Sequence, residues 1–144
     1  MLVSRELIPV HCGNIMILTM LKAKLHQAAI THAELHYEGS CAIDEELLEM
    51  LGILVNEQIQ IYNLNNGNRF TTYAIPAPRG SKMISVNGAA ALLASPNDRV
   101  IICAYAMFDA VEAKQFNPAI AMLDENNNIK STKNIQQDFL CKEE

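Results

Sequence analysis

The 144-residue chain lacks tryptophan, and aromatic residues make up only 6% of it. Charged residues are also scarce at 19%, against a usual value of about 25%. Hydrophobic residues nevertheless reach 50%, which excludes a disordered chain because such chains have too little apolar surface to fold. At roughly 100–200 residues per domain, the length predicts a single globular domain. So few charges are typical of a subunit that packs part of its surface against another.

Positive charge is scarce as well, because 11 Lys and Arg stand against 16 Asp and Glu, for a net charge of −5. Binding to a phosphate backbone requires clustered Lys and Arg, so we expect no nucleic-acid partner. No apolar run approaches the roughly 20 residues that span a bilayer. The first residues also lack the basic cluster and apolar stretch of a secretory signal. We therefore expect a cytoplasmic protein with no membrane partner.

Cysteine and glycine are too dispersed to form familiar sites. The cysteines are Cys12, Cys41, Cys103 and Cys141. Their wide spacing predicts reduced thiols rather than disulfides or a zinc site. The six glycines form neither a phosphate-binding loop nor a dinucleotide-binding motif. His32 and His36 have a spacing that would suit a metal on a helix, but the flanking residues do not continue a helix, so we predict no metal site.

What is present is a series of short apolar segments separated by turn residues. Strands are expected at 17–25, 28–30, 57–64, 69–75, 83–86, 99–106 and 116–123, with a last one from 129. Asp44 predicts the N-cap of a short helix that ends before Gly52, and a second short helix is expected from Gly88. About seven short strands and two short helices predict a mainly β fold, a small closed barrel.

The two ends of the chain differ from its middle. Residues 1–15 show no clear period, whereas Met16 begins a strong apolar run, so we expect 1–15 to be an N-terminal extension or a mis-assigned start. The barrel is expected over residues 16–128. A C-terminal strand and frayed tail are expected over 129–144.

Five motifs, read in order, carry the functional signal. They are KLH at 24–26, THAELHYEGSCAID at 31–44, NGNRFTTYAI at 66–75, RGS at 79–81 and SVNGAAA at 85–91. In this order and spacing, the chain resembles the pyruvoyl-dependent aspartate 1-decarboxylase family over roughly residues 16–128. The resemblance implies a double-psi β-barrel that assembles as a homotetramer with active sites between subunits. It also implies decarboxylation of L-aspartate to β-alanine and carbon dioxide, for pantothenate and coenzyme A synthesis.

The chemistry needs an electron sink, because loss of carbon dioxide leaves a carbanion and no ordinary side chain is a good electrophile. The resemblance implies that the chain makes its own. The Ser40 hydroxyl attacks the Gly39 carbonyl and converts the amide to an ester. Elimination then breaks the chain, and the resulting dehydroalanine hydrolyses to a pyruvoyl group, which forms a Schiff base with the substrate amine. Gly39 is expected to permit the strained backbone that this shift requires.

The same resemblance assigns roles to other residues. Arg69 is expected to hold a substrate carboxylate with its planar fork, supported by Lys24. Tyr73 is expected to donate a proton, because a phenol near pKa 10 is protonated at neutral pH. Thr72 is expected to polarise the Gly39 carbonyl and to line the substrate site. The remaining substrate-binding set is Asn87, Gly88, Ala89 and Ala90.

Two further expectations concern the shape of the site. Neighbouring strand residues face opposite sides, so Thr72 and Tyr73 can share one site only if the strand bends or bulges there. His26, Tyr37 and Tyr62 are expected to line the cavity. Each subunit would consist of two chains, and a separate maturation factor is a candidate partner.

Three other functions stay open at this point. The first is an uncleaved, inactive homologue that serves as a binding or regulatory barrel. The second is a small metal-binding protein that uses His32, His36 and Cys41. The third is a DNA-binding barrel, which the negative net charge disfavours.

Overall fold

The computed structural model describes residues 15–135, and nine strands in this part follow the order β2-β6-β3-β5-β4-β7-β1-β8-β9. The strands are β1 (Ile17–Ala29), β2 (His32–Glu34), β3 (Ser40–Asp44), β4 (Gln58–Asn63), β5 (Arg69–Ala77), β6 (Ile84–Asn87), β7 (Arg99–Asp109), β8 (Ala119–Leu123) and β9 (Ile129–Lys133). The helices are α1 (Glu45–Leu51), the 3-10 helix η1 (Gly88–Leu92) and α2 (Ala110–Gln115). The predicted mainly β class is confirmed, while closure into a barrel stays a prediction.

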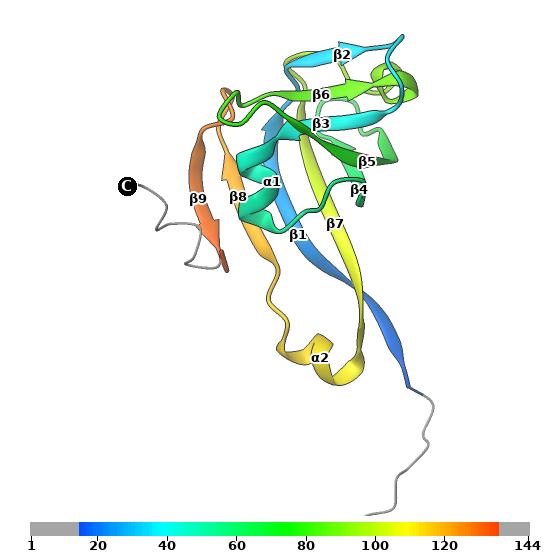
Figure 1. The fold of residues 1–144 in the computed structure, drawn as a ribbon, viewed down its shortest axis with the longest axis vertical. Coiled ribbons are helices and arrows are strands. Elements are labelled where there is room, and N and C mark those ends of the chain that lie inside the picture. The colour runs from blue at the N-terminus through cyan, green and yellow to red at the C-terminus, as the bar shows by residue number, and fades with distance from the viewer. Residues whose placement is uncertain (1–14, 136–144) are drawn as a thin grey trace, which may run out of the picture.

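The two longest strands, β1 and β7, form an antiparallel ribbon that extends away from the rest of the fold and carries α2 at its far end (Figure 1). Strands β2, β3, β5 and β6 gather at the other end of the molecule. Strand β3 pairs with β5 in parallel and with β6 antiparallel, so it has a hydrogen-bonded neighbour on each side. Among the described residues, no helix is long and apolar enough to cross a membrane.

The core is built from the inward-facing residues of these strands. Ile59 and Ile61 of β4 are fully buried, whereas Gln58 between the turn and Ile59 is exposed. This alternation is the one predicted for residues 57–64. Leu25 of β1 and Ile102 of β7 pack in the same core cluster. The buried face of the sheet thus leaves its opposite face available for polar side chains.

Several predicted elements differ from the structure. Residues 17–25 and 28–30, predicted as two strands, belong mainly to the single strand β1. A register shift between Leu25 and Ala28, with Gln27 at φ 59°, interrupts the pairing without ending the strand. The turn-like break in the sequence is therefore a β-bulge. The patterns also did not indicate β2, β3 or α2.

The predicted helix at 44–51 is confirmed in detail. Asp44 is the N-cap of α1 and accepts from the Glu46 amide, and Gly52 ends the helix at φ 67°. The expected short helix from Gly88 is present as the 3-10 helix η1. The predicted extension at 1–15 lies outside the described residues except for Ile15, as does the tail beyond residue 135.

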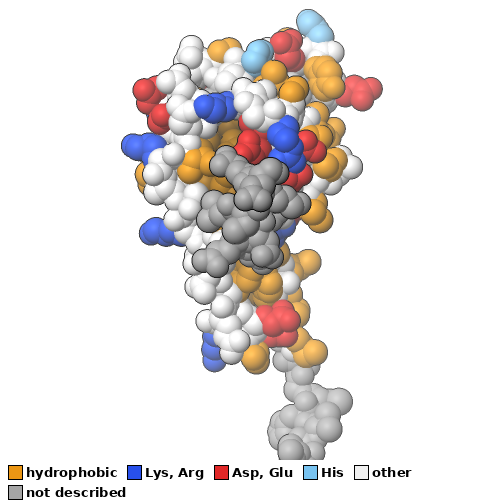
Figure 2. Space-filling model, turned by 60° about the vertical axis from the view of Figure 1, so that its left-hand side comes forward, with side chains coloured by type: hydrophobic (Ala, Val, Ile, Leu, Met, Phe, Trp, Pro, Cys, Tyr) orange, Lys and Arg blue, Asp and Glu red, His pale blue; other side chains and the backbone are white. Residues whose placement is uncertain are grey.

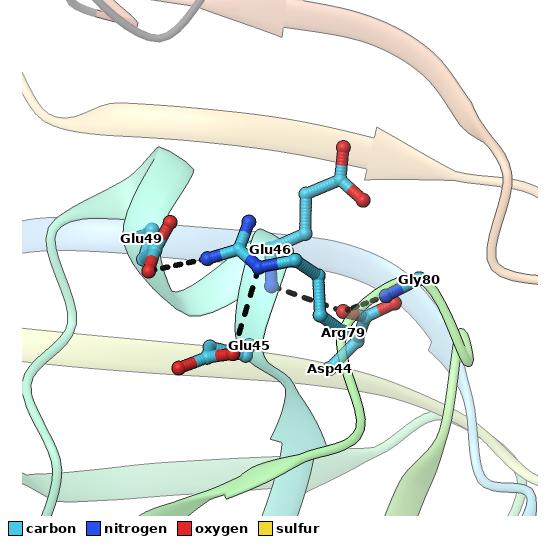
Figure 3. Close-up of polar contacts among 6 residues, drawn as sticks. All are labelled: Asp44, Glu45, Glu46, Glu49, Arg79 and Gly80. Carbon is cyan, nitrogen blue, oxygen red and sulfur yellow. Dashed lines mark hydrogen bonds and ion pairs between the residues drawn. The ribbon is translucent and has the colours of Figure 1, made fainter. Parts of the chain in front are cut away.

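Asp44 also joins α1 to the loop that precedes β6, as Figure 3 shows. Its side chain is 2% exposed, and Oδ1 accepts hydrogen bonds from the amides of Glu46 at 3.0 Å and Gly80 at 2.9 Å. Oδ2 accepts from the Lys82 amide at 2.8 Å. Arg79 lies across the helix and pairs with Glu49 and, at 3.6 Å, with Glu45 (Figure 3).

The carboxylate of Asp44 therefore satisfies three backbone donors at the end of β3, and its loss should be costly. We expect Asp44→Ala to lower the free energy of unfolding by about 2–4 kcal/mol, because three partly buried backbone amides lose their acceptor together with the N-cap of α1. Urea denaturation of both proteins measures this. Glu49→Ala is the matched control and should cost under about 1 kcal/mol, since it removes only an exposed ion pair. Equal losses in the two variants would contradict the anchoring role of Asp44.

Candidate active site

Ser40 lies at the start of β3, buried between β5 and β6. It is 2% exposed and stands opposite Asn87 of β6. The Asn87 amide nitrogen donates to Ser40 Oγ at 3.1 Å, and Asn87 Oδ1 accepts from the Ser85 hydroxyl at 2.9 Å. Ser85 therefore fixes the orientation of the amide that holds the serine hydroxyl. Ser85 was not predicted, although its position two residues before Asn87 places both on one face of a strand.

The backbone at Ser40 is strained. Its φ is 117°, a region that residues with a side chain rarely adopt, and such a conformation persists only where the surrounding structure enforces it. The strain was expected at Gly39, which has no such positive φ. The difference arises because Ser40 pairs with β6 at the point where the chain enters β3 from the Gly39 loop.

Gly88 packs directly against the Gly39 loop. A Cβ at Gly88 would lie 2.9 Å from the Gly39 Cα and 3.1 Å from the Tyr37 carbonyl oxygen. Gly88 also has φ 63°, which favours glycine. Both observations mean that only glycine fits at this position. Of the other predicted loop residues, Ala89 is exposed and Ala90 is buried.

Tyr73, rather than Thr72, reaches the Gly39 carbonyl. The Tyr73 hydroxyl donates to the Gly39 carbonyl oxygen at 3.3 Å, and the Tyr73 side chain is 40% exposed. Pairing between β4 and β5 runs without a register shift from Tyr73 to Arg69, so the expected bulge is absent from β5. Thr72 stands opposite the buried Ile59 and faces the other side of the sheet from Tyr73. The expectation that Thr72 polarises this carbonyl is thus not what the geometry shows.

Arg69 and Lys24 belong to a separate cavity of about 450 Å³. The lining residues are Leu21, Lys24, Tyr62, Asn63, Leu64, Gly67, Arg69, Ile101, Cys103 and Tyr105. The cavity contains two cationic side chains and no carboxylate, so it suits an anionic group. The Arg69 guanidinium carbon lies 4.0 Å from the centroid of the Tyr62 ring, a cation–π contact. Tyr62 and Lys24 thus line one cavity.

The structure does not bring this cavity to Ser40 within one chain. Ser40, Asn87 and Tyr73 are not among the residues that line it. Arg69 precedes Tyr73 by four positions on β5, which corresponds to roughly 13 Å along a strand. The predicted site residues therefore form two groups, one around Ser40 and one around Arg69.

Tyr37 and His26, which were also predicted to line the cavity, lie outside the cavity of Arg69. Tyr37 is 58% exposed. His26 lines a neighbouring cavity with Lys24, and its Nδ1 is buried without a hydrogen-bond partner. Burial, followed by the positive charge of Lys24, lowers the pKa of His26. His26 therefore favours its neutral form.

The metal-binding alternative would need several ligating side chains close together. Residues 15–135 contain no group of three or more His, Cys, Asp or Glu side chains that could hold a metal ion. His32 lies on β2, and His36 lies in the turn that follows, both exposed. Cys41 is buried, and burial raises the pKa of its thiol to about 12. The helix that would aim both histidines at one metal is not formed here.

Fold and site together define a small, mainly β protein with a strained, buried serine and a separate cationic cavity. The sequence model of the aspartate decarboxylase family matches residues 16–130. The chain therefore belongs to the aspartate decarboxylase family and is an enzyme of the lyase class. The family membership predicted from the sequence motifs is thereby confirmed.

Curated relatives agree with the family match. A protein named aspartate 1-decarboxylase from Alcanivorax borkumensis is 63% identical over 116 residues, which cover 81% of this chain and 92% of that protein. One of the same name from Psychromonas ingrahamii is 64% identical over 114 residues, 79% of this chain and 90% of the relative. A third protein of this name, from Caulobacter vibrioides, is 59% identical over 115 residues, which cover 80% of this chain and 98% of that protein.

The contact between Gly88 and the Gly39 loop yields a prediction. We expect Gly88→Ala to abolish the native position of the loop, because a Cβ would meet backbone atoms that cannot move aside. Thermal unfolding should show a destabilised protein. Gly52→Ala is the control, since Gly52 has a similar φ of 67° but open space around its Cβ position. A Gly88→Ala protein that behaves like Gly52→Ala would contradict the steric argument.

Proposed function

We propose that this chain cleaves itself between Gly39 and Ser40 and then decarboxylates L-aspartate to β-alanine and carbon dioxide, a step of pantothenate synthesis. The observation that carries the proposal is the buried, strained Ser40 held by Asn87, in a chain that belongs to the aspartate decarboxylase family. The proposed catalytic domain spans residues 16–128, within the segment that the family matches. The proposed location is the cytoplasm.

Self-cleavage begins when the Ser40 hydroxyl oxygen attacks the Gly39 carbonyl carbon. The new C–O bond forms as the Gly39–Ser40 C–N bond breaks, so an ester replaces the amide and the Ser40 nitrogen becomes an amine. Loss of the Cα proton then expels the Gly39 carboxylate and leaves dehydroalanine. Water converts this group to a ketone and releases ammonia. The hydrogen bonds from Asn87 to Ser40 Oγ and from Tyr73 to the Gly39 oxygen support the first step.

Relief of backbone strain favours the same step. A residue held in a sparsely populated φ region stores about 1–3 kcal/mol, which is released when the bond before it breaks. Ser40 at φ 117° is such a residue. After cleavage, β3 would keep its pairing with β5 and β6, so the new chain end would stay where Ser40 is now.

The surroundings of Ser40 fit a pyruvoyl group at this position. Ser40 is buried, Asn87 donates a hydrogen bond to it, and the Tyr73 hydroxyl lies at the carbonyl on its other side. The chemistry that a pyruvoyl group supplies is an electron sink for the electrons that carbon dioxide leaves behind. Tyr73 then holds the proton that the reaction requires, and its hydroxyl is already directed at the scissile bond.

The cationic cavity is proposed to hold the substrate. Arg69 offers a planar fork that suits a carboxylate, and Lys24 adds a second positive charge in the same cavity. A dicarboxylate such as aspartate matches this pair of charges. Gly88, Ala89, Ala90 and Thr72 are proposed to complete the substrate site by their position in the family motifs.

The separation of the two groups supports an active site formed between subunits. Ser40 and Tyr73 of one subunit would face the cavity of Arg69 and Lys24 on the next, within a homotetramer whose subunits each contain chains 1–39 and 40–144. Exposed apolar side chains favour such contacts: Met107 on β7 is 75% exposed, and hydrophobic side chains appear along the protruding end (Figure 2).

Intact mass spectrometry tests the cleavage. We expect two chains that meet at residues 39 and 40, with a carbonyl on the larger one that hydrazine or borohydride traps. Ser40→Ala should remain a single chain and form no β-alanine, because it lacks the attacking oxygen. Ser95→Ala, which removes an exposed hydroxyl, should cleave normally. A wild-type chain that stays intact after warm incubation, even with a cell extract to supply a maturation factor, would instead support the uncleaved binding barrel.

Tyr73→Phe tests the proton donor. We expect the variant to cleave more slowly, because the Gly39 oxygen loses its hydrogen bond from Tyr73, and to reach complete cleavage on long incubation, because Ser40 and Asn87 are unchanged. Decarboxylation should fall by about 10²–10⁴-fold, the usual contribution of a general acid. Cleavage is read by mass, and β-alanine by chromatography. Full decarboxylation by the cleaved variant would assign proton donation to another group.

A further inference from the structure

Hydrogen bonds link three polar side chains next to the Arg69 guanidinium, those of Gln60, Tyr62 and Tyr105. The Tyr62 hydroxyl donates to Gln60 Oε1 at 2.8 Å and lies 2.7 Å from the Tyr105 hydroxyl. Tyr62 has only one hydroxyl proton, and this proton is directed to Gln60. The Tyr105 hydroxyl must therefore be the donor in the phenol–phenol contact. This hydrogen bond, together with burial, raises the pKa of Tyr105 and keeps it in the donating form.

Strand pairing places these groups on one face of the sheet. Arg69 of β5 stands opposite Tyr62 of β4, and Tyr62 stands opposite Ile101 of β7. Tyr105 is four positions after Ile101, so both lie on the same face of β7. Arg69, Tyr62 and Tyr105 all line the cationic cavity. The register thus creates a continuous path from the Tyr105 hydroxyl to the face of the ring that carries the guanidinium.

Arg69 depends on this ring for its orientation. Its side chain is exposed, and within residues 15–135 it forms no salt bridge and no hydrogen bond to a side chain. The face of Tyr62, 4.0 Å from the guanidinium carbon, is the contact that limits its freedom. Tyr62 in turn is held at its hydroxyl by Gln60 and Tyr105. A long side chain that is ordered before it binds loses less entropy on binding.

We propose that Tyr105 is a positioning residue for Arg69: its hydroxyl locks the Tyr62 ring, and the ring holds the guanidinium ready for a substrate carboxylate. This inference rests on the proposed function, in which Arg69 binds aspartate. Loss of the Tyr105 hydroxyl should weaken substrate binding and leave the reacting groups around Ser40 unchanged. The effect is therefore expected in KM and not in kcat.

Steady-state kinetics of the cleaved enzyme test this. We expect Tyr105→Phe to raise KM for aspartate about 3–10-fold, as for one lost hydrogen bond, with kcat within twofold of the wild type. Gln60→Met removes the side chain that accepts from the Tyr62 hydroxyl and should also raise KM. This second variant tests the proposal even if Tyr105→Phe fails to fold. Ser95→Ala, which removes an exposed hydroxyl outside the cavity, is the control and should leave both constants unchanged.

A double-mutant comparison shows whether Tyr105 acts through Arg69. In an Arg69→Gln background, adding Tyr105→Phe should change kcat/KM by less than twofold, because the group it positions is gone. An equal fold-change in both backgrounds, or an unchanged KM for both Tyr105→Phe and Gln60→Met in an active enzyme, would overturn this inference alone. A wild-type chain that neither cleaves nor forms β-alanine would overturn the proposed function and the inference together.

Discussion

The position of β3 between β5 and β6 is the constraint on which the site depends. Pairing on both sides sets Ser40 opposite Asn87 and places it beside Tyr73, which precedes the Ala74 partner of Cys41. A slip of one residue would turn Ser40 to the other face of the sheet and separate it from both partners. Asp44 holds the far end of the strand through three backbone amides. The strand that begins at Ser40 is thus fixed along its whole length.

Strain at Ser40 and the close packing of Gly88 on Gly39 are two consequences of this arrangement. The sheet determines where β3 begins, and the loop before it must pass close to the first residue of η1. The chain meets that demand with a positive φ at Ser40 and without a side chain at Gly88. Strain of this kind persists only because the paired strands on each side prevent its relaxation.

Elements with a clear local signal were predictable from the sequence. The alternation of Ile59 and Ile61 identified β4, and Asp44 with Gly52 identified both ends of α1. Strand β3 was missed because it is buried on both faces, so SCAID shows no alternation. The strand β1 was divided in two because a β-bulge and a turn look alike in sequence.

The sequence by itself determined the family, through motifs in register. The same motifs direct the proposal of cleavage to the bond between Gly39 and Ser40. Only the tertiary structure decided which side chains surround that bond. Tyr73 and not Thr72 donates a hydrogen bond to the Gly39 carbonyl. Tyr105 contacts the hydroxyl of Tyr62, whose ring packs against Arg69. The reason is that strand alternation tells which face a residue occupies, whereas its neighbours on that face come from other strands and are set by the register of the assembled sheet.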